Sequence, residues 1–199
     1  MGPAFDFDDA VLGHGLPAEA EQALRDAGES RADPPRAMAA LMRACAMAPD
    51  HPAVLIAFYR HYFYGHRLRL ARHVARKALS VGAKALGLPL AWREVPERAL
   101  PGAADDAATR FYLWVLKGYA YLSLRLDDAA EARDALMKLR ALDPEDRVGG
   151  ALLEAVRQRR QRRDDDADGV DSDDGPALPV FGAAAWARVA GTANPSGAA

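Results

Sequence analysis

Apolar residues recur at helical spacing through most of the chain, and proline, glycine and aspartate divide these recurrences into segments. Apolar side chains at positions i, i+3 and i+4 share one face of a helix. This spacing predicts helices over residues 17–28, 34–48, 52–64, 68–86, 111–126, 129–142 and 145–161. Asp33 and Asp128 are suitable N-cap residues, while Gly65 and Pro144 follow the ends of predicted helices.

Residues 87–108 interrupt the helical pattern with three prolines and two glycines. These residue types are typical of turns and loops. We therefore predict a long loop or insertion, with one helical turn around Trp92.

The composition agrees with a helical protein. Half of the 199 residues are apolar and only 8% are aromatic, with Ala and Leu dominating and β-branched residues scarce. This bias favours helices over sheet. We predict an all-α class with a single helical domain over residues 18–161, preceded by a flexible N-terminus over residues 1–17.

Three of the predicted helices share a spacing of small and apolar residues. Counted from Ala37 and from Ala132, small or apolar residues follow after 4 and 7 positions, and a proline follows after 12 positions, at Pro49 and Pro144. Alanines at 71, 75 and 78 repeat the first two of these spacings without the proline. The stretch LRLDDAAEARDALMKLRALDP resembles the second half of a tetratricopeptide repeat (TPR) motif, and LMRACAMAPDHP resembles its end. The resemblance implies a helical-hairpin solenoid of about three helix pairs, closed by a capping helix at residues 145–161.

The TPR resemblance also implies a site, because the first helix of each pair lines a concave groove that holds a segment of a partner protein. The residues that align with groove positions are Arg60, Phe63, Tyr64, Trp114, Lys117, Tyr121 and Arg125. Aromatic and guanidinium groups are enriched at binding hot spots. The alternative is that Phe63, Tyr64 and Trp114 are core residues.

Lys117 and Arg125 resemble, incompletely, the basic positions with which some TPR grooves clamp a terminal carboxylate. The asparagines expected beside them are absent. The residues therefore favour a generally basic groove over a carboxylate clamp.

The overall charge gives no reason to expect nucleic acid or an anionic membrane as a partner, because the net charge is −2 and the isoelectric point is near 6.2. Basic residues do gather on the predicted helix over residues 68–86, at positions 69, 72, 73, 76 and 77. We interpret them as a solvated outer face.

The C-terminal part separates charges of opposite sign. Five arginines lie within residues 157–163, and seven aspartates follow within residues 164–174. We predict a disordered acidic tail over residues 162–199, in which residues 178–190 are either a short docking segment or unstructured. A regulatory module that its own acidic tail autoinhibits is the alternative function.

The residues do not form a recognisable catalytic site. None of His14, His51, His61, His66 and His73 forms the i, i+4 pair of a helical zinc hydrolase. Cys45 has no neighbouring histidine, and no glycine-rich phosphate loop is present. We predict a protein that is not an enzyme, with no cofactor and no metal; an enzyme built on His61 and His66 would need one of these.

The predicted function is a non-catalytic scaffold, adaptor or assembly factor that binds a client protein. The absence of a signal peptide pattern and of a long apolar run predicts a cytoplasmic protein without a membrane segment. The phrases HPAVLIAFYRHYFYGHRL and FYLWVLKGYAYLSLRL resemble small TPR proteins found beside bacterial nitrogen-fixation genes. That resemblance implies a nitrogenase component, or a maturation factor for it, as the client.

Overall fold

The computed structural model describes residues 15–100 and 106–166, and every regular element in these residues is helical. The predicted all-α class is therefore confirmed. The elements are α2 (Ala18–Glu29), α3 (Pro34–Met47), α4 (Pro52–Tyr64), α5 (Leu68–Ala85), the 3₁₀ turn η1 (Trp92–Glu94), α6 (Ala107–Arg125), α7 (Ala129–Leu142) and α8 (Gly150–Asp166). No helix in the described part of the chain is long and apolar enough to cross a membrane.

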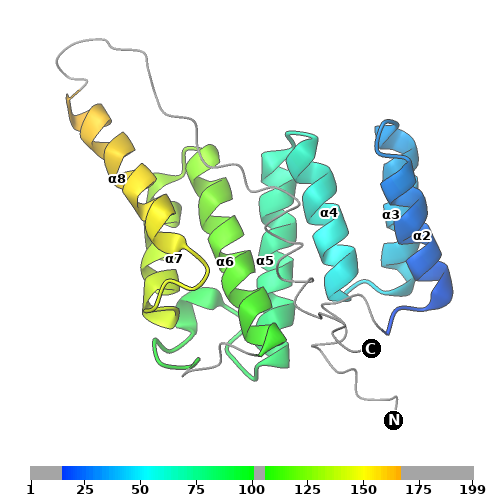
Figure 1. Cartoon of the computed structure of the whole chain (residues 1–199), viewed down its shortest axis with the longest axis horizontal. Helices are drawn as coiled ribbons and strands as arrows, with labels where there is room; N and C mark the ends of the chain where they lie inside the picture. Colours follow the sequence, from blue (N-terminus) through cyan, green and yellow to red (C-terminus); the bar gives the residue numbers. More distant parts are fainter. Residues whose placement is uncertain (1–14, 101–105, 167–199) are drawn as a thin grey trace, which may run out of the picture.

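Consecutive helices pack against one another in pairs. Extensive contacts join α2 to α3, α4 to α5 and α6 to α7, and α5 also packs on α6. Figure 1 shows the helices in a row, with α2, α4, α6 and α8 in one layer and α3, α5 and α7 in the other. Within the first layer, α6 contacts both α4 and α8, although neither helix is next to it along the chain.

Side-chain caps explain where three of the helices begin. Asp33 accepts a hydrogen bond from the Arg36 backbone N–H at 3.1 Å, and Asp106 accepts one from the Thr109 backbone N–H at 2.7 Å. Asp128 caps α7 in the same way. Such caps satisfy N–H groups that have no partner within the helix. Because Asp106 is the cap, α6 begins at Ala107, earlier than the apolar pattern predicts.

The last helix begins at Gly150, later than the predicted start near residue 145. Asp143 accepts hydrogen bonds from the backbone N–H groups of Arg147 at 3.1 Å and Val148 at 2.9 Å, which holds residues 143–149 in a turn. Gly149 completes this turn with a φ of 70°, a conformation that glycine adopts without steric cost. The connection between α7 and α8 is therefore an ordered turn.

Two predicted segments lie largely outside the described residues. The flexible N-terminus over residues 1–17 is described only from residue 15, and the acidic tail, with its docking segment at residues 178–190, is described only to residue 166. Residues 162–166, which the pattern assigns to the tail, belong to α8.

The buried side chains form two clusters. The larger one joins α4, α5, α6, α7, α8 and η1, and the smaller one joins α2 and α3 to α4. Val54 and Phe58 on α4 belong to the smaller cluster, whereas Leu55 and Tyr59 belong to the larger one. Opposite faces of α4 therefore connect the N-terminal pair to the rest.

The predicted loop before α6 is packed against the helices over its described part. Trp92 is only 6% exposed and Val95 is buried, and both lie in the larger cluster. The Lys138 ammonium on α7 donates a hydrogen bond to the Val95 carbonyl at 2.6 Å. Arg93 lies over the Trp92 ring at 4.2 Å and forms an ion pair with Glu131 of α7. The segment around Trp92 therefore contacts α7 while its own apolar side chains pack in the larger cluster.

A chain of polar contacts joins α5, α6 and α7. The Tyr119 hydroxyl donates a hydrogen bond to Glu131 and accepts one from Arg76 at 3.1 Å. Burial opposes the negative charge of Glu131, but the hydrogen bonds from Arg93 and Tyr119 outweigh it and lower the pKa of Glu131 below its ordinary value. Glu131 is therefore ionised at neutral pH and serves as the common acceptor.

The basic side chains of α5 have structural partners that the sequence pattern did not reveal. Arg72 forms an ion pair with Asp128 at 2.8 Å, across to the start of α7. Lys77 pairs with Asp50 at 2.9 Å and donates to the Pro49 carbonyl, which connects α5 to the turn after α3. Together with Arg76, these residues join neighbouring helices, whereas Arg69 and His73 are exposed.

The packing of Trp92 predicts that the segment before α6 contributes to stability. Replacing Trp92 with alanine removes a buried aromatic side chain and should lower the free energy of unfolding by about 3 to 5 kcal/mol. Urea unfolding followed by circular dichroism measures this change. Leu90→Ala is the control, because Leu90 is 60% exposed and should change stability by less than about 0.5 kcal/mol. Equal stability of both variants would contradict the docking of this segment.

Two buried tyrosines of α6 should respond oppositely to loss of the hydroxyl. The Tyr112 hydroxyl is buried without a hydrogen-bond partner, and burial raises the pKa of Tyr112 to about 12. Tyr112→Phe removes this unpaired group and should raise the free energy of unfolding by about 1 kcal/mol. Tyr119→Phe removes two hydrogen bonds and should lower it by about 1 to 3 kcal/mol. Thermal unfolding of both variants, with opposite shifts expected, is the measurement.

Candidate functional site

The seven residues predicted to line a groove lie on single faces of two helices. Trp114, Lys117, Tyr121 and Arg125 follow one another along α6 at intervals of three or four residues, so they form one stripe. Arg60, Phe63 and Tyr64 form a similar stripe at the C-terminal end of α4. A ring contact between the two helices brings these stripes together.

The contact is centred on Phe63. Its ring lies 5.9 Å from the ring of Tyr121 on α6 and stacks on Tyr59 at 5.8 Å with an interplanar angle of 11°. The Tyr64 and Phe63 rings form a T-shaped pair with their centres 5.5 Å apart, and Tyr64 remains 48% exposed. Aromatic rings held in this way present rigid area at low entropic cost.

Arg125 extends the ring contact at the end of α6. Its guanidinium donates a hydrogen bond to the Tyr121 hydroxyl at 3.0 Å and lies 5.9 Å from the centre of that ring. Arg125 is exposed, and Arg60 on α4 is partly exposed. We call Arg60, Phe63, Tyr64, Tyr121 and Arg125 the aromatic patch.

Lys117 and Trp114 form a separate contact, closer to the N-terminus of α6 than Tyr121 is. The Lys117 ammonium lies 4.7 Å from the centre of the Trp114 ring and donates a hydrogen bond to the Val148 carbonyl in the turn before α8. Lys117 is only 9% exposed, and Tyr121 is 2% exposed. These two side chains therefore present little surface to a partner, although they belong to the predicted set.

Helix α8 covers part of the stripe, which the sequence did not reveal. Leu153 of α8 is fully buried, and Arg160 donates a hydrogen bond to the Leu124 carbonyl at 3.0 Å. The position of α8 depends on contacts between residues more than thirty positions apart. Of the seven predicted residues, Tyr64 and Arg125 are exposed, and Arg60, Phe63 and Trp114 are partly exposed.

A pocket of about 290 Å³ opens beside Trp114, between α6, the end of α7 and the segment before α6. Its apolar wall includes Leu100, Leu113, Leu142 and Val148, and its rim carries charges of both signs. Arg147 and Glu145 on this rim form an ion pair at 2.7 Å. The pocket accommodates an apolar side chain, but its charges largely compensate one another.

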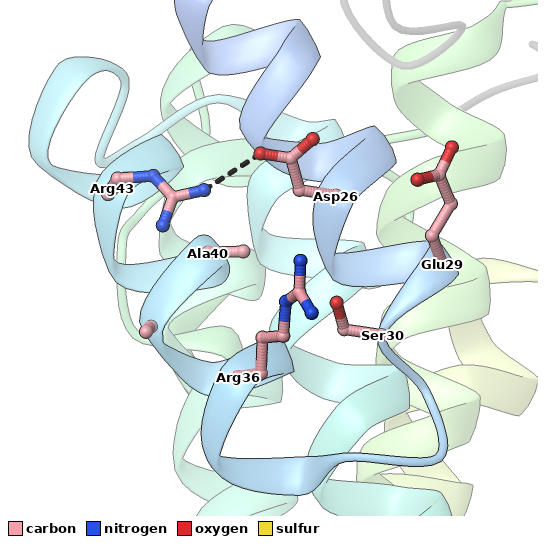
Figure 2. Close-up of a pocket in the computed structure, with 7 residues that line it drawn as sticks. Asp26, Glu29, Ser30, Arg36, Ala40 and Arg43 are labelled. Atoms are coloured by element: carbon pink, nitrogen blue, oxygen red, sulfur yellow. Dashed lines mark hydrogen bonds and ion pairs between the residues drawn. The ribbon is translucent and has the colours of Figure 1, made fainter.

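A second pocket, of about 260 Å³, lies between α2 and α3 (Figure 2). Asp26 on α2 forms an ion pair with Arg43 on α3 at 2.8 Å, while Arg36 points from α3 toward α2. The hydrogen bond from Gln22 and the neighbouring Arg43 keep the pKa of Asp26 below its ordinary value. Sequence reasoning missed this pocket because its residues come from two helices. It holds balanced charges and no pairing of a nucleophile with a base.

The described histidines and the cysteine occupy different surroundings. His61 is half-buried, and burial together with the nearby Arg67 lowers the pKa of His61, which is therefore neutral at pH 7. His66 lies in the exposed turn before α5, and Cys45 packs at the edge of the smaller cluster. Among the side chains that the structure describes, in residues 15–100 and 106–163, no group of three or more His, Cys, Asp or Glu is arranged to hold a metal ion.

The chain has a relative among known proteins. It is 38% identical over 155 residues to the "Uncharacterized 19.8 kDa protein in nifW 5′ region" of Azotobacter chroococcum mcd 1, an alignment that covers 74% of this chain and 84% of the relative. The chain belongs to the family of this protein. No protein-family profile and no solved structure matches the chain.

Two cations of α6 should differ in their effect on stability. Lys117→Met removes the hydrogen bond that ties α6 to the Val148 carbonyl and should lower the free energy of unfolding by about 1.5 to 3 kcal/mol. Arg125→Met removes an exposed guanidinium and should lower it by less than about 1 kcal/mol. Chemical unfolding of both variants measures the two losses in the free energy of unfolding. A larger loss for Arg125→Met would show that the structural and exposed roles are reversed.

Proposed function

We propose that this chain is a non-catalytic, cytoplasmic interaction module with a TPR-like arrangement, which binds a segment of a client protein on the aromatic patch in a process connected with nitrogen fixation. The proposal has three parts, which are the repeat architecture, the binding surface and the biological setting.

The repeat architecture is supported by burial at equivalent positions. The residues that share the offsets of 4 and 7 face neighbouring helices in all three pairs, and each is buried: Ala37, Leu41, Ala44, Ala71, Ala75, Ala78, Ala132, Leu136 and Leu139. Small side chains at such positions allow helices to approach closely. Each pair in a helical repeat needs a neighbour to cover its apolar face, and the alternating layers of Figure 1 meet that need.

The aromatic patch is the single observation that carries the binding function. Tyr64 is among the exposed large apolar side chains, and its ring contacts Phe63. The Phe63 ring in turn meets Tyr121, whose hydroxyl accepts a hydrogen bond from the Arg125 guanidinium. Rigid aromatic surface beside an arginine is typical of the central part of a protein interface.

The nitrogen-fixation setting is supported by the relative from Azotobacter chroococcum, whose name places it in the nifW 5′ region. A client that is a nitrogenase component or its maturation factor is consistent with this setting. The aromatic patch would then bind an exposed segment of that client.

Affinity capture from cells grown under nitrogen-fixing conditions tests the proposed function. The full-length chain and a Tyr64→Ala, Arg125→Glu variant are used as baits, and the captured proteins are identified and quantified by mass spectrometry. We expect the variant to lose a specific client by about tenfold or more, because hot-spot residues contribute about 1.4 kcal/mol or more each.

Arg133→Glu is the matched control, because Arg133 is an exposed arginine on α7, outside the aromatic patch. The control should capture the client as well as the unaltered chain does. Equal loss in both variants would indicate a general effect of charge, and no loss in either would move the binding site away from the aromatic patch.

A further inference from the structure

The charged residues of α4 and α6 are all cationic. Asp and Glu make up 28 of the 199 residues, yet neither helix contains one. The two helices do carry Arg60, Arg110, Lys117 and Arg125, so the bias concerns the sign of the charge and not its absence. Helices α3 and α5 share this bias, whereas α7 carries Glu131 and Asp134.

Some arginines of this protein have carboxylate partners, and the two arginines of the aromatic patch do not. Arg43, Arg72 and Arg93 each form an ion pair with a carboxylate of another element. Neither Arg60 nor Arg125 forms an ion pair with a described residue, and the contacts of Arg125 are with the uncharged Tyr121. No ion pair therefore compensates their positive charge within residues 15–100 and 106–163.

The rings of the aromatic patch hold this charge in place. The Tyr121 hydroxyl and ring orient the Arg125 guanidinium. Phe63 stacks on Tyr59 and also contacts the rings of Tyr64 and Tyr121. A guanidinium oriented before binding loses less entropy when it meets a carboxylate. The partly exposed faces of Phe63 and Tyr64 offer apolar contact within the same surface.

We propose that the aromatic patch recognises an acidic segment of the client protein, in which an apolar side chain packs on Phe63 and Tyr64 while flanking carboxylates meet Arg60 and Arg125. This inference rests on the proposed function and specifies the chemistry of the client. Complementary charge accelerates association and excludes basic competitors, and the apolar contact adds affinity.

An acidic peptide suits this surface better than a nucleic acid does. Two uncompensated arginines are few for a phosphate backbone, whose binding grows with the number of phosphates that are neutralised. The net charge of −2 also disfavours non-specific attraction to nucleic acid. The pairing of one apolar surface with two flanking cations matches a peptide that carries carboxylates around an apolar residue.

Fluorescence anisotropy with the full-length chain and a labelled synthetic peptide tests this proposal. The peptide has about ten residues, with Asp and Glu on both sides of one phenylalanine and an amidated C-terminus, which is long enough at ~3.3 Å per residue to cross both helices. We expect the Asn and Gln analogue of the peptide to bind about tenfold more weakly or worse. Binding should also weaken between ~0.1 M and ~1 M salt, because the Debye length falls from ~10 Å to ~3 Å.

Matched variants locate the interaction. Arg60→Met combined with Arg125→Met should weaken binding of the acidic peptide by about tenfold without affecting its neutral analogue, whereas Arg133→Met should have no effect. Tyr64→Ala should abolish the advantage of the phenylalanine peptide over its alanine analogue. Circular dichroism of each variant checks that the helices are intact.

Several outcomes would overturn the proposal. Equal binding of the neutral peptide would exclude recognition of acidic groups, and binding only of a peptide with a free C-terminus would assign the site to a terminal carboxylate. Single-stranded DNA that binds equally well and is lost in the same arginine variant would indicate phosphate recognition. Tighter peptide binding after replacement of the aspartates at 168, 171, 173 and 174 by asparagine would assign the patch to the chain's own acidic residues.

The capture experiment separates this proposal from the proposed function. A client that is captured through Tyr64 and Arg125, together with failure of the acidic peptide, would retain the binding function and reject the acidic chemistry. Loss of both would reject the two together.

Discussion

Burial of α6 on nearly all sides is the constraint on which the described structure depends. From Ala107 to Leu124, only Arg110 and Trp114 retain more than a small exposed surface. Helix α5, helix α7, the turn before α8 and the segment around Trp92 each cover part of α6. A helix that is apolar all round must be enclosed, so these elements have to be arranged about it. The polar groups on α6 are correspondingly used for contacts between elements: Tyr119 meets Glu131, and Lys117 meets the Val148 carbonyl.

The arginines and lysines of this protein differ in their partners. Some of these side chains form ion pairs with carboxylates on other elements, as Arg72, Arg93 and Lys77 do. Each of these ion pairs connects two elements of the fold. Arg60 and Arg125 reach no described carboxylate. Exposed ion pairs contribute little to stability, but uncompensated cations on rigid aromatic rings create a local potential that favours an anionic partner. The same residue type therefore serves packing on α5 and, in our proposal, recognition on α4 and α6.

The sequence indicates which of the predicted site residues share a helix face, but it does not indicate which of them are exposed. Their role in binding stays a prediction. Phe63, Tyr64, Tyr121 and Arg125 come together because α4 and α6 are neighbours in one layer (Figure 1), a relation that helical repeats produce between alternate helices. Tyr121 and Lys117 are nevertheless buried, since Phe63 and the turn before α8 cover them. A one-dimensional pattern identifies the face of a helix on which a residue lies, but it does not identify what covers that face.

The sequence by itself determined the class and the borders of most helices, because apolar spacing, proline and aspartate caps act within a few residues of one another. It predicted α4 and α5 closely and placed a turn at Trp92. Tertiary structure decided the remainder. Trp92 and Val95 pack in the core, and the hydrogen bonds to Asp143 form a turn, so that α8 begins only at Gly150. Basic residues of α5 form ion pairs with carboxylates on other elements. The physical reason is that each of these contacts joins separate elements of the chain. Its energy arises only once the helices are stacked, so no local pattern in the sequence records it.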